Sequence, residues 1–298
     1  MRAALDCVPC LIRQTLEAMK RISSDPISHE ILIREVPQWT SEIDLDSPPP
    51  VLSQRIHGRL REEFGFEDPY RLEKIAQNRR VLSLLPEWRA KLDAAPDPLA
   101  LAVRLAIAGN GVDLGSHKQA GGPGLRRSIQ QALSEPLMGD QEALRREVEG
   151  ARSILYLADN AGEIILDRLL IERLGPERVT VAVRGAPVLN DATFADARTA
   201  GLDNLVEVVE NGSDAPGTVI EDCSESFLRH LAEADLILAK GQGNYITLGH
   251  ETSNVFFLFK AKCRVMAEHA GVPLGAQVLA RPHPGTVGAL GPPTRQDS

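Results

Sequence analysis

Apolar residues recur at helical spacing through the first half of the chain. A first stripe contains Leu11, Leu16 and Met19, and comparable stripes cover residues 31–39, 51–64, 70–92 and 98–108. This 3.6-residue period is typical of amphipathic helices, and strand-like alternation is almost absent before residue 150. We therefore expect residues 1–150 to form a helical portion.

The pattern changes to strand, loop and helix from residue 153 onward. Short apolar runs with β-branched or aromatic members occur at residues 154–158, 179–183, 205–209, 236–239 and 255–259. Alternation of such runs with helices predicts an α/β fold with a Rossmann-like, mostly parallel sheet and helices on both of its faces. We place this portion at residues 151–280 and expect a flexible tail at 281–298, which lacks periodicity. Ligands in such folds bind at the carboxyl ends of the strands.

A first polar cluster follows the strand expected at 154–158. It contains Asp159, Asn160, Gly162 and Glu163. Adjacent Asp and Asn oxygens suit a hard divalent cation, and a glycine at the start of a helix lets backbone N–H groups face an anion. Helix capping explains the same residues equally well.

Second and third clusters follow later strands. Arg184, Asn190 and Asp191 come after the strand at 179–183, and Asp191 lies about one βα unit beyond Asp159, so that one cation could join the two carboxylates. Taken alone, Asn190 or Asp191 is more simply an N-cap.

The third cluster, residues 240–244, follows the strand at 236–239. Lys240 beside glycines is suited to contact a phosphate, and Asn244 lies in the same loop. A solvated loop lysine is the simpler alternative for Lys240. Residues 210–218 form one more polar, glycine-rich strand end. Four such strand ends together indicate a site for a metal and an anion.

Composition and missing motifs narrow the functional class. The formal net charge is −8, which disfavours non-specific binding to nucleic acid or to a membrane surface. No apolar run approaches membrane-spanning length, and the N-terminus lacks a signal-peptide core, so we expect a cytoplasmic protein. The sequence has no P-loop and no GxGxxG after a strand, which disfavours nucleoside triphosphatases and dinucleotide-binding enzymes.

Cysteines provide one further motif. Cys7 and Cys10 form a single CxxC, which is found in redox pairs and in zinc sites. Because no second CxxC is present and the motif opens a helical region, a structural or incidental role is the simpler interpretation. Cys223 and Cys263 are expected to be buried small apolar residues.

The order of these motifs resembles that of the damage-control phosphatase family. The segments that carry the resemblance are LADNAGEIILDRLL, RGAPVLNDATFADA, ENGSDAPGT and ADLILAKGQGNYITL. The segments DCVPCLIRQ and AGNGVDLG are similar to the shorter prokaryotic branch of that family. The likeness extends from about residue 5 to residue 280.

The resemblance implies a metal-dependent phosphatase that hydrolyses small phosphorylated metabolites, such as sugar phosphates or damaged phosphometabolites. By their match to the family motifs, Asp159, Asn160 and Asp191 would hold a divalent cation, with manganese, cobalt, nickel or magnesium as candidates. Metals of this kind neutralise phosphoryl oxygens and orient the attacking group. The nucleophile would be either a metal-activated water or the Asp159 carboxylate itself.

The same resemblance assigns further site residues. Glu163 is a candidate general base or substrate contact, and Lys240 would bind and stabilise the phosphoryl group. Asn110 and Asp113 match a helical segment that faces the active site. Arg184 and Asn244 complete the substrate-binding candidates.

Two other functions remain as alternatives. A non-catalytic phosphometabolite-binding protein would use the same pocket without turnover, although a pure anion binder gains nothing from adjacent carboxylates. A carboxyl methyltransferase is disfavoured because the glycine-rich S-adenosylmethionine loop is absent. The sequence leaves the substrate, the preferred metal and the oligomeric state open.

Overall fold

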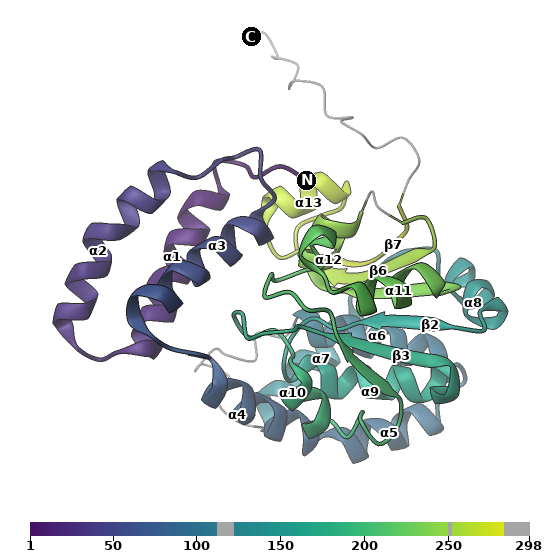
Figure 1. Cartoon of the computed structure of the whole chain (residues 1–298). Coiled ribbons are helices and arrows are strands. Elements are labelled where there is room, and N and C mark those ends of the chain that lie inside the picture. The colour runs from purple at the N-terminus through teal and green to yellow at the C-terminus, as the bar shows by residue number, and fades with distance from the viewer. Residues whose placement is uncertain (112–121, 250–251, 283–298) are drawn as a thin grey trace, which may run out of the picture.

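A seven-stranded sheet forms the centre of the molecule in the computed structural model, which describes residues 1–111, 122–249 and 252–282 (Figure 1). Its strands are β1 (Leu137–Gly139), β2 (Ile154–Leu157), β3 (Val179–Val183), β4 (Glu207–Glu210), β5 (Leu236–Lys240), β6 (Val255–Lys260) and β7 (Gln277–Ala280). They lie in the order β1-β7-β6-β5-β2-β3-β4, and every pair is parallel except β6 and β7.

Helices cover both faces of this sheet. The helices are α1 (Cys7–Ile22), α2 (Pro26–Ser41), α3 (Pro49–Phe64), α4 (Arg71–Leu82), α5 (Leu85–Asp93), α6 (Pro98–Gly111), α7 (Gly122–Ser134), α8 (Gln141–Gly150), α9 (Glu163–Leu174), α10 (Phe194–Thr199), α11 (Glu225–Glu233), α12 (Gly241–Leu248) and α13 (Arg264–Ala270). Ile154 and Tyr156 of β2 enter the core under α6 and α9, whereas Leu155 and Leu157 enter the core under α11, α12 and α13. This alternation is what a strand buried on both faces requires.

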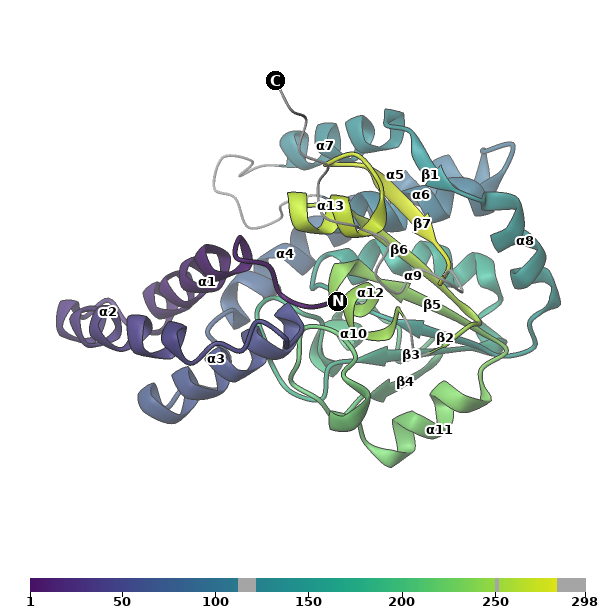
Figure 2. The ribbon, with the colours of Figure 1, turned by 90° about the horizontal axis from the view of Figure 1, so that it is seen from above.

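Helices α1, α2 and α3 form a separate lobe beside the sheet (Figure 2). Their apolar faces enclose a core of their own that includes Leu11, Leu60 and Trp39. The chain's other tryptophan, Trp88 on α5, lies instead in the core beneath the sheet. Helices α5 to α8 also precede residue 151, yet they pack into that core with the strands.

The predicted fold class is confirmed, and the sheet is larger than the sequence pattern indicated. All five expected strands are present, and β1 and β7 add an edge that was not predicted. Strand β1 has only three residues and is largely exposed, so it carries no apolar run. Strand β7 is short and pairs antiparallel with β6, which a pattern of βα units does not suggest.

Part of the expected tail and one central segment lie beyond the described residues. Of the expected tail at 281–298, residues 283–298 lie outside the described part of the chain, as does the segment 112–121. Among the described residues, none of the helices combines the length and the apolar character needed to cross a membrane.

Candidate functional site

The loops after β2 and β3 are joined directly at the carboxyl edge of the sheet. The Ala161 N–H donates to the Asn190 carbonyl at 2.8 Å, and Asn160 forms an antiparallel bridge with Asp191. Asp159 immediately precedes this bridge. The structure therefore brings together the two motifs that the sequence placed on neighbouring strands, because parallel strands end at one edge.

Two amides bridge two carboxylates at this junction. Asn110 Nδ2, from the end of α6, donates to Asp159 Oδ2 at 2.7 Å and to Glu163 Oε2 at 3.1 Å. Asn160 Nδ2 donates to the same two oxygens at 2.6 and 2.9 Å. Donors shared in this way hold two like charges side by side, and they place the predicted residue Asn110 within the site.

Burial and crowding raise the proton affinity of this acidic group. Burial, followed by the charges of Glu163 and Asp191, raises the pKa of Asp159 to about 7. Burial also raises the pKa of Asp191, against the opposing charge of Arg184. Burial pushes the pKa of Glu163 upward too, but the charges of Lys240 and Lys262 and the hydrogen bonds from Asn160 and Lys240 together outweigh burial. The pKa of Glu163 is therefore lowered, and this carboxylate stays ionised.

Arg184 lies beneath the two aspartates and is only 2% exposed. Its Nε donates to Asp191 Oδ2 at 2.7 Å, while its Nη2 lies 4.0 Å from Asp159 Oδ1. Within the described residues, Nη2 has no hydrogen-bond partner although it is buried. A buried guanidinium N–H without an acceptor is costly, so this atom is suited to an anionic ligand.

Lys240 lies deeper than predicted. It is the last residue of β5, so its side chain follows Leu238 toward the core under α6 and α9. Its Nζ donates to Ala106 O, Glu163 Oε1 and Asp167 Oδ1 at 2.9, 2.6 and 2.5 Å, and the residue is 0% exposed. Three acceptors therefore use all three donors of the ammonium, and its predicted contact with a phosphate stays a prediction.

A count of charges tests whether this end of the sheet fits a cation. Buried carboxylates here are Asp159, Glu163, Asp167 and Asp191, and the buried cations bonded to them are Lys240 and Arg184. When all four carboxylates are ionised, they exceed the two cations by two, which is the charge that a divalent ion supplies. In the described part of the chain no three His, Cys, Asp or Glu side chains form a ready metal cage. The candidate donors are instead two carboxylates and the amide oxygen of Asn160.

Other predicted site residues have different surroundings. Asn244 is fully buried, where its Nδ2 donates to Lys240 O at 2.8 Å and its Oδ1 accepts from Thr218 at 2.9 Å. These bonds are internal to the protein, so the predicted contact of Asn244 with substrate stays a prediction. Asp113 lies outside the described residues. Gly241 packs directly over Asp159 at a φ of 78°, where a Cβ atom would overlap the carboxylate.

Two residues of α4 belong to the site although the sequence analysis missed them. Lys74 Nζ donates to Asp191 O at 3.3 Å and pairs with Asp196 at 3.1 Å. Asn78 Oδ1 accepts from the Gly162 N–H at 2.6 Å, and both side chains are buried. They hold the β2 and β3 loops from the helical side. Their i, i+4 spacing on one helix face was the available signal.

The CxxC motif opens α1 near the turn that precedes α13. Cys7, Cys10 and Cys263 are free thiols. Cys263 is exposed, so the expectation that it is buried was wrong. Its charge contributes to a raised pKa of Cys7, behind the larger effect of burial, so the two side chains lie within electrostatic reach of each other.

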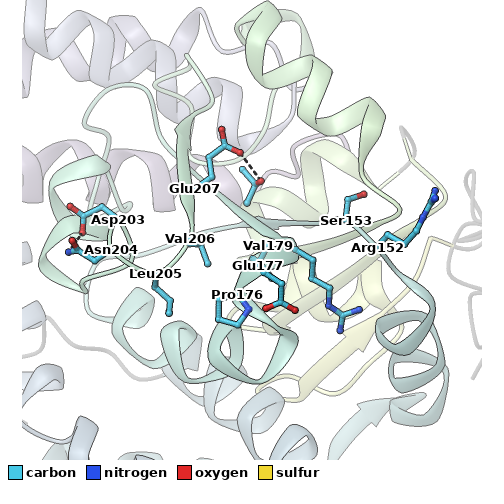
Figure 3. Close-up of a pocket in the computed structure, with 12 residues that line it drawn as sticks. Arg152, Ser153, Pro176, Glu177, Val179, Asp203, Asn204, Leu205, Val206 and Glu207 are labelled. Carbon is cyan, nitrogen blue, oxygen red and sulfur yellow. Dashed lines mark hydrogen bonds between the residues drawn. The ribbon is translucent and has the colours of Figure 1, made fainter.

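The opposite, amino-terminal edge of the sheet carries an open groove of about 580 Å³ (Figure 3). It is lined by residues at the starts of β2, β3 and β4, among them Arg152, Glu177 and Asp203. These three residues are exposed, in contrast to the buried charges at the carboxyl edge. Among its lining residues, the groove holds no cluster of buried ions.

Comparison with known proteins supports the resemblance in the motifs. The chain matches the family described as "Damage-control phosphatase ARMT1-like domain" over residues 3–278. It is 34% identical to a damage-control phosphatase of Archaeoglobus fulgidus over 286 residues, covering 91% of this chain and 96% of that protein. It is 33% identical to an uncharacterised protein of Methanocaldococcus jannaschii, covering 93% of this chain and 94% of that protein.

A solved structure agrees with these sequence matches. The crystal structure of a DUF89 family protein from Pyrococcus horikoshii superposes with a TM-score of 0.87 at 30% identity, covering 95% of this chain and all of the other. The likeness therefore includes the α1–α3 lobe as well as the sheet. Since the family match spans nearly the whole chain and agrees with both the motifs and the fold, the chain belongs to the damage-control phosphatase family.

Proposed function

We propose that this protein is a metal-dependent phosphomonoester hydrolase acting on small phosphorylated metabolites. Membership of the damage-control phosphatase family supports phosphatase chemistry in general. The observation that carries the specific proposal is the buried surplus of two negative charges beside the unpartnered Arg184 Nη2. Such an arrangement suits a divalent cation together with a phosphate.

Asp159, Asn160 and Asp191 are the residues that would hold the cation. Asp159 Oδ2 already accepts two amide N–H bonds, so Oδ1 is the carboxylate oxygen that would bind the cation. Asn160 uses its Nδ2 on the carboxylates, so its amide oxygen is available. A bound divalent cation would neutralise phosphoryl oxygens and orient the attacking group.

The chain's own residues supply binding and proton chemistry. Arg184 would bind a phosphoryl oxygen through Nη2 while its Nε holds Asp191 in place. Glu163 stays ionised beside Lys240, so it can accept a proton from an attacking water or a hydrogen bond from a substrate hydroxyl. Lys240 keeps Glu163 in position, and Lys74 and Asn78 fix the loops that carry the aspartates.

Phosphate release by chelator-stripped protein tests this proposal. The substrates are p-nitrophenyl phosphate and a panel of sugar phosphates, with and without Mn²⁺, Co²⁺, Ni²⁺ or Mg²⁺. We expect release that depends on metal and is lost in Asp191→Asn, which keeps the shape of the side chain beside Arg184. Equal release by chelated and metal-loaded protein would contradict the proposal. Binding of these compounds without any release would favour the non-catalytic alternative.

A quench experiment separates the two candidate nucleophiles. Attack by the Asp159 carboxylate would transfer the phosphoryl group to the protein and release the alcohol, and water would then hydrolyse the acyl phosphate. Acid quenching with ³²P-labelled substrate would trap label on the protein in that case. Attack by water transfers the phosphoryl group directly and leaves the protein unlabelled.

A further inference from the structure

The turn between β6 and α13 is attached to the site by two hydrogen bonds. The Lys260 N–H donates to Asn110 Oδ1 at 3.1 Å, and Asn110 in turn bridges Asp159 and Glu163. Two residues later, the Lys262 N–H donates to Gln242 Oε1 at 2.7 Å in the first turn of α12. Because β6 runs parallel to β5, this turn lies at the same carboxyl edge as the aspartates.

The Lys262 side chain is exposed, unlike its backbone anchor. Its ammonium makes no ion pair with any other residue that the structure describes. Its backbone is nevertheless held beside the site, since Gln242, which accepts the Lys262 N–H, directly follows Gly241, and Gly241 packs against the Asp159 carboxylate. Lys262 is thus a cation with an anchored backbone and a free head group near the acidic junction.

Lys240 differs from Lys262 in each of these respects. It is fully buried, and Ala106 O, Glu163 Oε1 and Asp167 Oδ1 accept all of its N–H bonds. A phosphate would have to displace one of these acceptors and leave a buried carboxylate unpaired, which is costly. Lys262 can meet the same phosphate without breaking a bond to the described residues.

We propose that Lys262 is a substrate-binding residue whose ammonium contacts the phosphate group from the solvent side of the site. Arg184 Nη2 would contact the same group from the buried side, so that two cations enclose it. This inference rests on the proposed function, because it assigns a ligand to the same site.

Binding of inorganic phosphate to the full chain tests the inference, with Mn²⁺ present throughout and calorimetry as the readout. We expect Lys262→Ala to weaken phosphate binding by about tenfold, the loss of one charge-assisted hydrogen bond, and Lys262→Arg to stay within about threefold. Arg264→Ala is the matched control, because it removes the same charge two positions along the chain from another exposed side chain. It should bind phosphate within about twofold of the wild type.

Steady-state kinetics adds a second readout. A binding role for Lys262 predicts a KM raised about tenfold in Lys262→Ala, with kcat changed less than threefold. Wild-type phosphate affinity in Lys262→Ala, or an equal loss in Arg264→Ala, would overturn the inference and leave the proposed function standing. If the wild type releases no phosphate with any metal, the proposed function fails, and the phosphate titration still decides whether Lys262 binds the anion.

Discussion

Charged residues are buried at the carboxyl edge of the sheet and exposed at its amino edge. At the carboxyl edge, Asp159 and Asp191 are buried beside Arg184, and their pKa values are raised. At the amino edge, Glu177 and Asp203 stand exposed around an open groove. Burying ions in surplus opposes folding, so a chain retains such a cluster where a ligand compensates for it. This difference in buried charge, and not the size of a cavity, is why we place the proposed site at the carboxyl edge.

The largest effect is expected for Asp159→Asn at the carboxyl edge. This change removes one of the surplus charges, so activity should fall by about 10³-fold or more, the loss of several kcal/mol of metal-based stabilisation. The metal-free protein should become more stable by about 1 kcal/mol at pH 8, because a buried like-charge repulsion is relieved. Urea denaturation and phosphate release measure the two changes. A variant that is both less active and less stable would argue that Asp159 is structural.

A matched pair of glycines compares the edges directly. Gly241→Ala would push a Cβ atom into the Asp159 carboxylate, so we expect activity to fall by about 10- to 100-fold, the effect of displacing a reacting group by about 1 Å. Gly175→Ala, near the groove, has a similarly positive φ of 89°, but its Cβ would meet only the flexible side chains of Glu177 and Arg178. Both changes should cost about 1 kcal/mol of stability through backbone strain. Only Gly241→Ala should lose activity. Equal losses of activity in the two variants would contradict the proposed difference between the two edges of the sheet.

The pH dependence of stability gives a third and smaller test. Folding raises the pKa of Asp159 and of Asp167 to about 7 from the ordinary 3.8. The folded state therefore holds protons that the unfolded chain has released, and this stabilising contribution is lost as pH rises through 7. The Tm of the metal-free protein should fall by about 2 °C or more between pH 6.5 and 8.5, since 1 kcal/mol corresponds to about 2–4 °C.

One group whose titration would change stability in the opposite direction has little effect in this pH interval. Burial lowers the pKa of His57 to about 4, so its effect is confined mainly to pH values below 6.5. Added Mn²⁺ should raise the Tm more at pH 8.5 than at pH 6.5, because the cation binds ionised carboxylates. A Tm independent of pH in the metal-free protein would contradict the raised pKa values of Asp159 and Asp167.

The smallest effect is expected at the amino edge. Glu177→Gln removes an exposed charge from the groove, so we expect stability within about 0.5 kcal/mol and kcat/KM within about twofold of the wild type. Urea denaturation and phosphate release measure these two quantities. A large loss of activity would show that the groove contributes to function and that the contrast between the two edges is incomplete.

The sequence predicted the fold class and the meeting of two motifs because both follow from local patterns. Apolar runs at 179–183 and 255–259 mark strands buried on both faces. Asp159 and Asp191 follow strands that are adjacent and parallel, so topology alone brings them together.

Other features depend on where a side chain points or on distant partners. Lys240 was expected at a strand tip with its ammonium on a phosphate, yet it is the last residue of β5, and strand alternation turns its side chain into the core. The acceptor Asp167 lies on an apolar helix where a buried acid looks like an ordinary polar position. Lys74 and Asn78 reach the site only because α4 packs beside α9, a contact between segments far apart in the chain.

Because each of the two separate cores contains one tryptophan, intrinsic fluorescence can follow each core by itself. One tryptophan, Trp39, reports on the α1–α3 lobe, and the other, Trp88, reports on the core beneath the sheet. Replacing either by phenylalanine leaves a single fluorophore whose emission shifts to the red when its own core admits water. Denaturation followed in the two variants would therefore show whether the lobe and the sheet come apart in one step or in sequence, without any added dye.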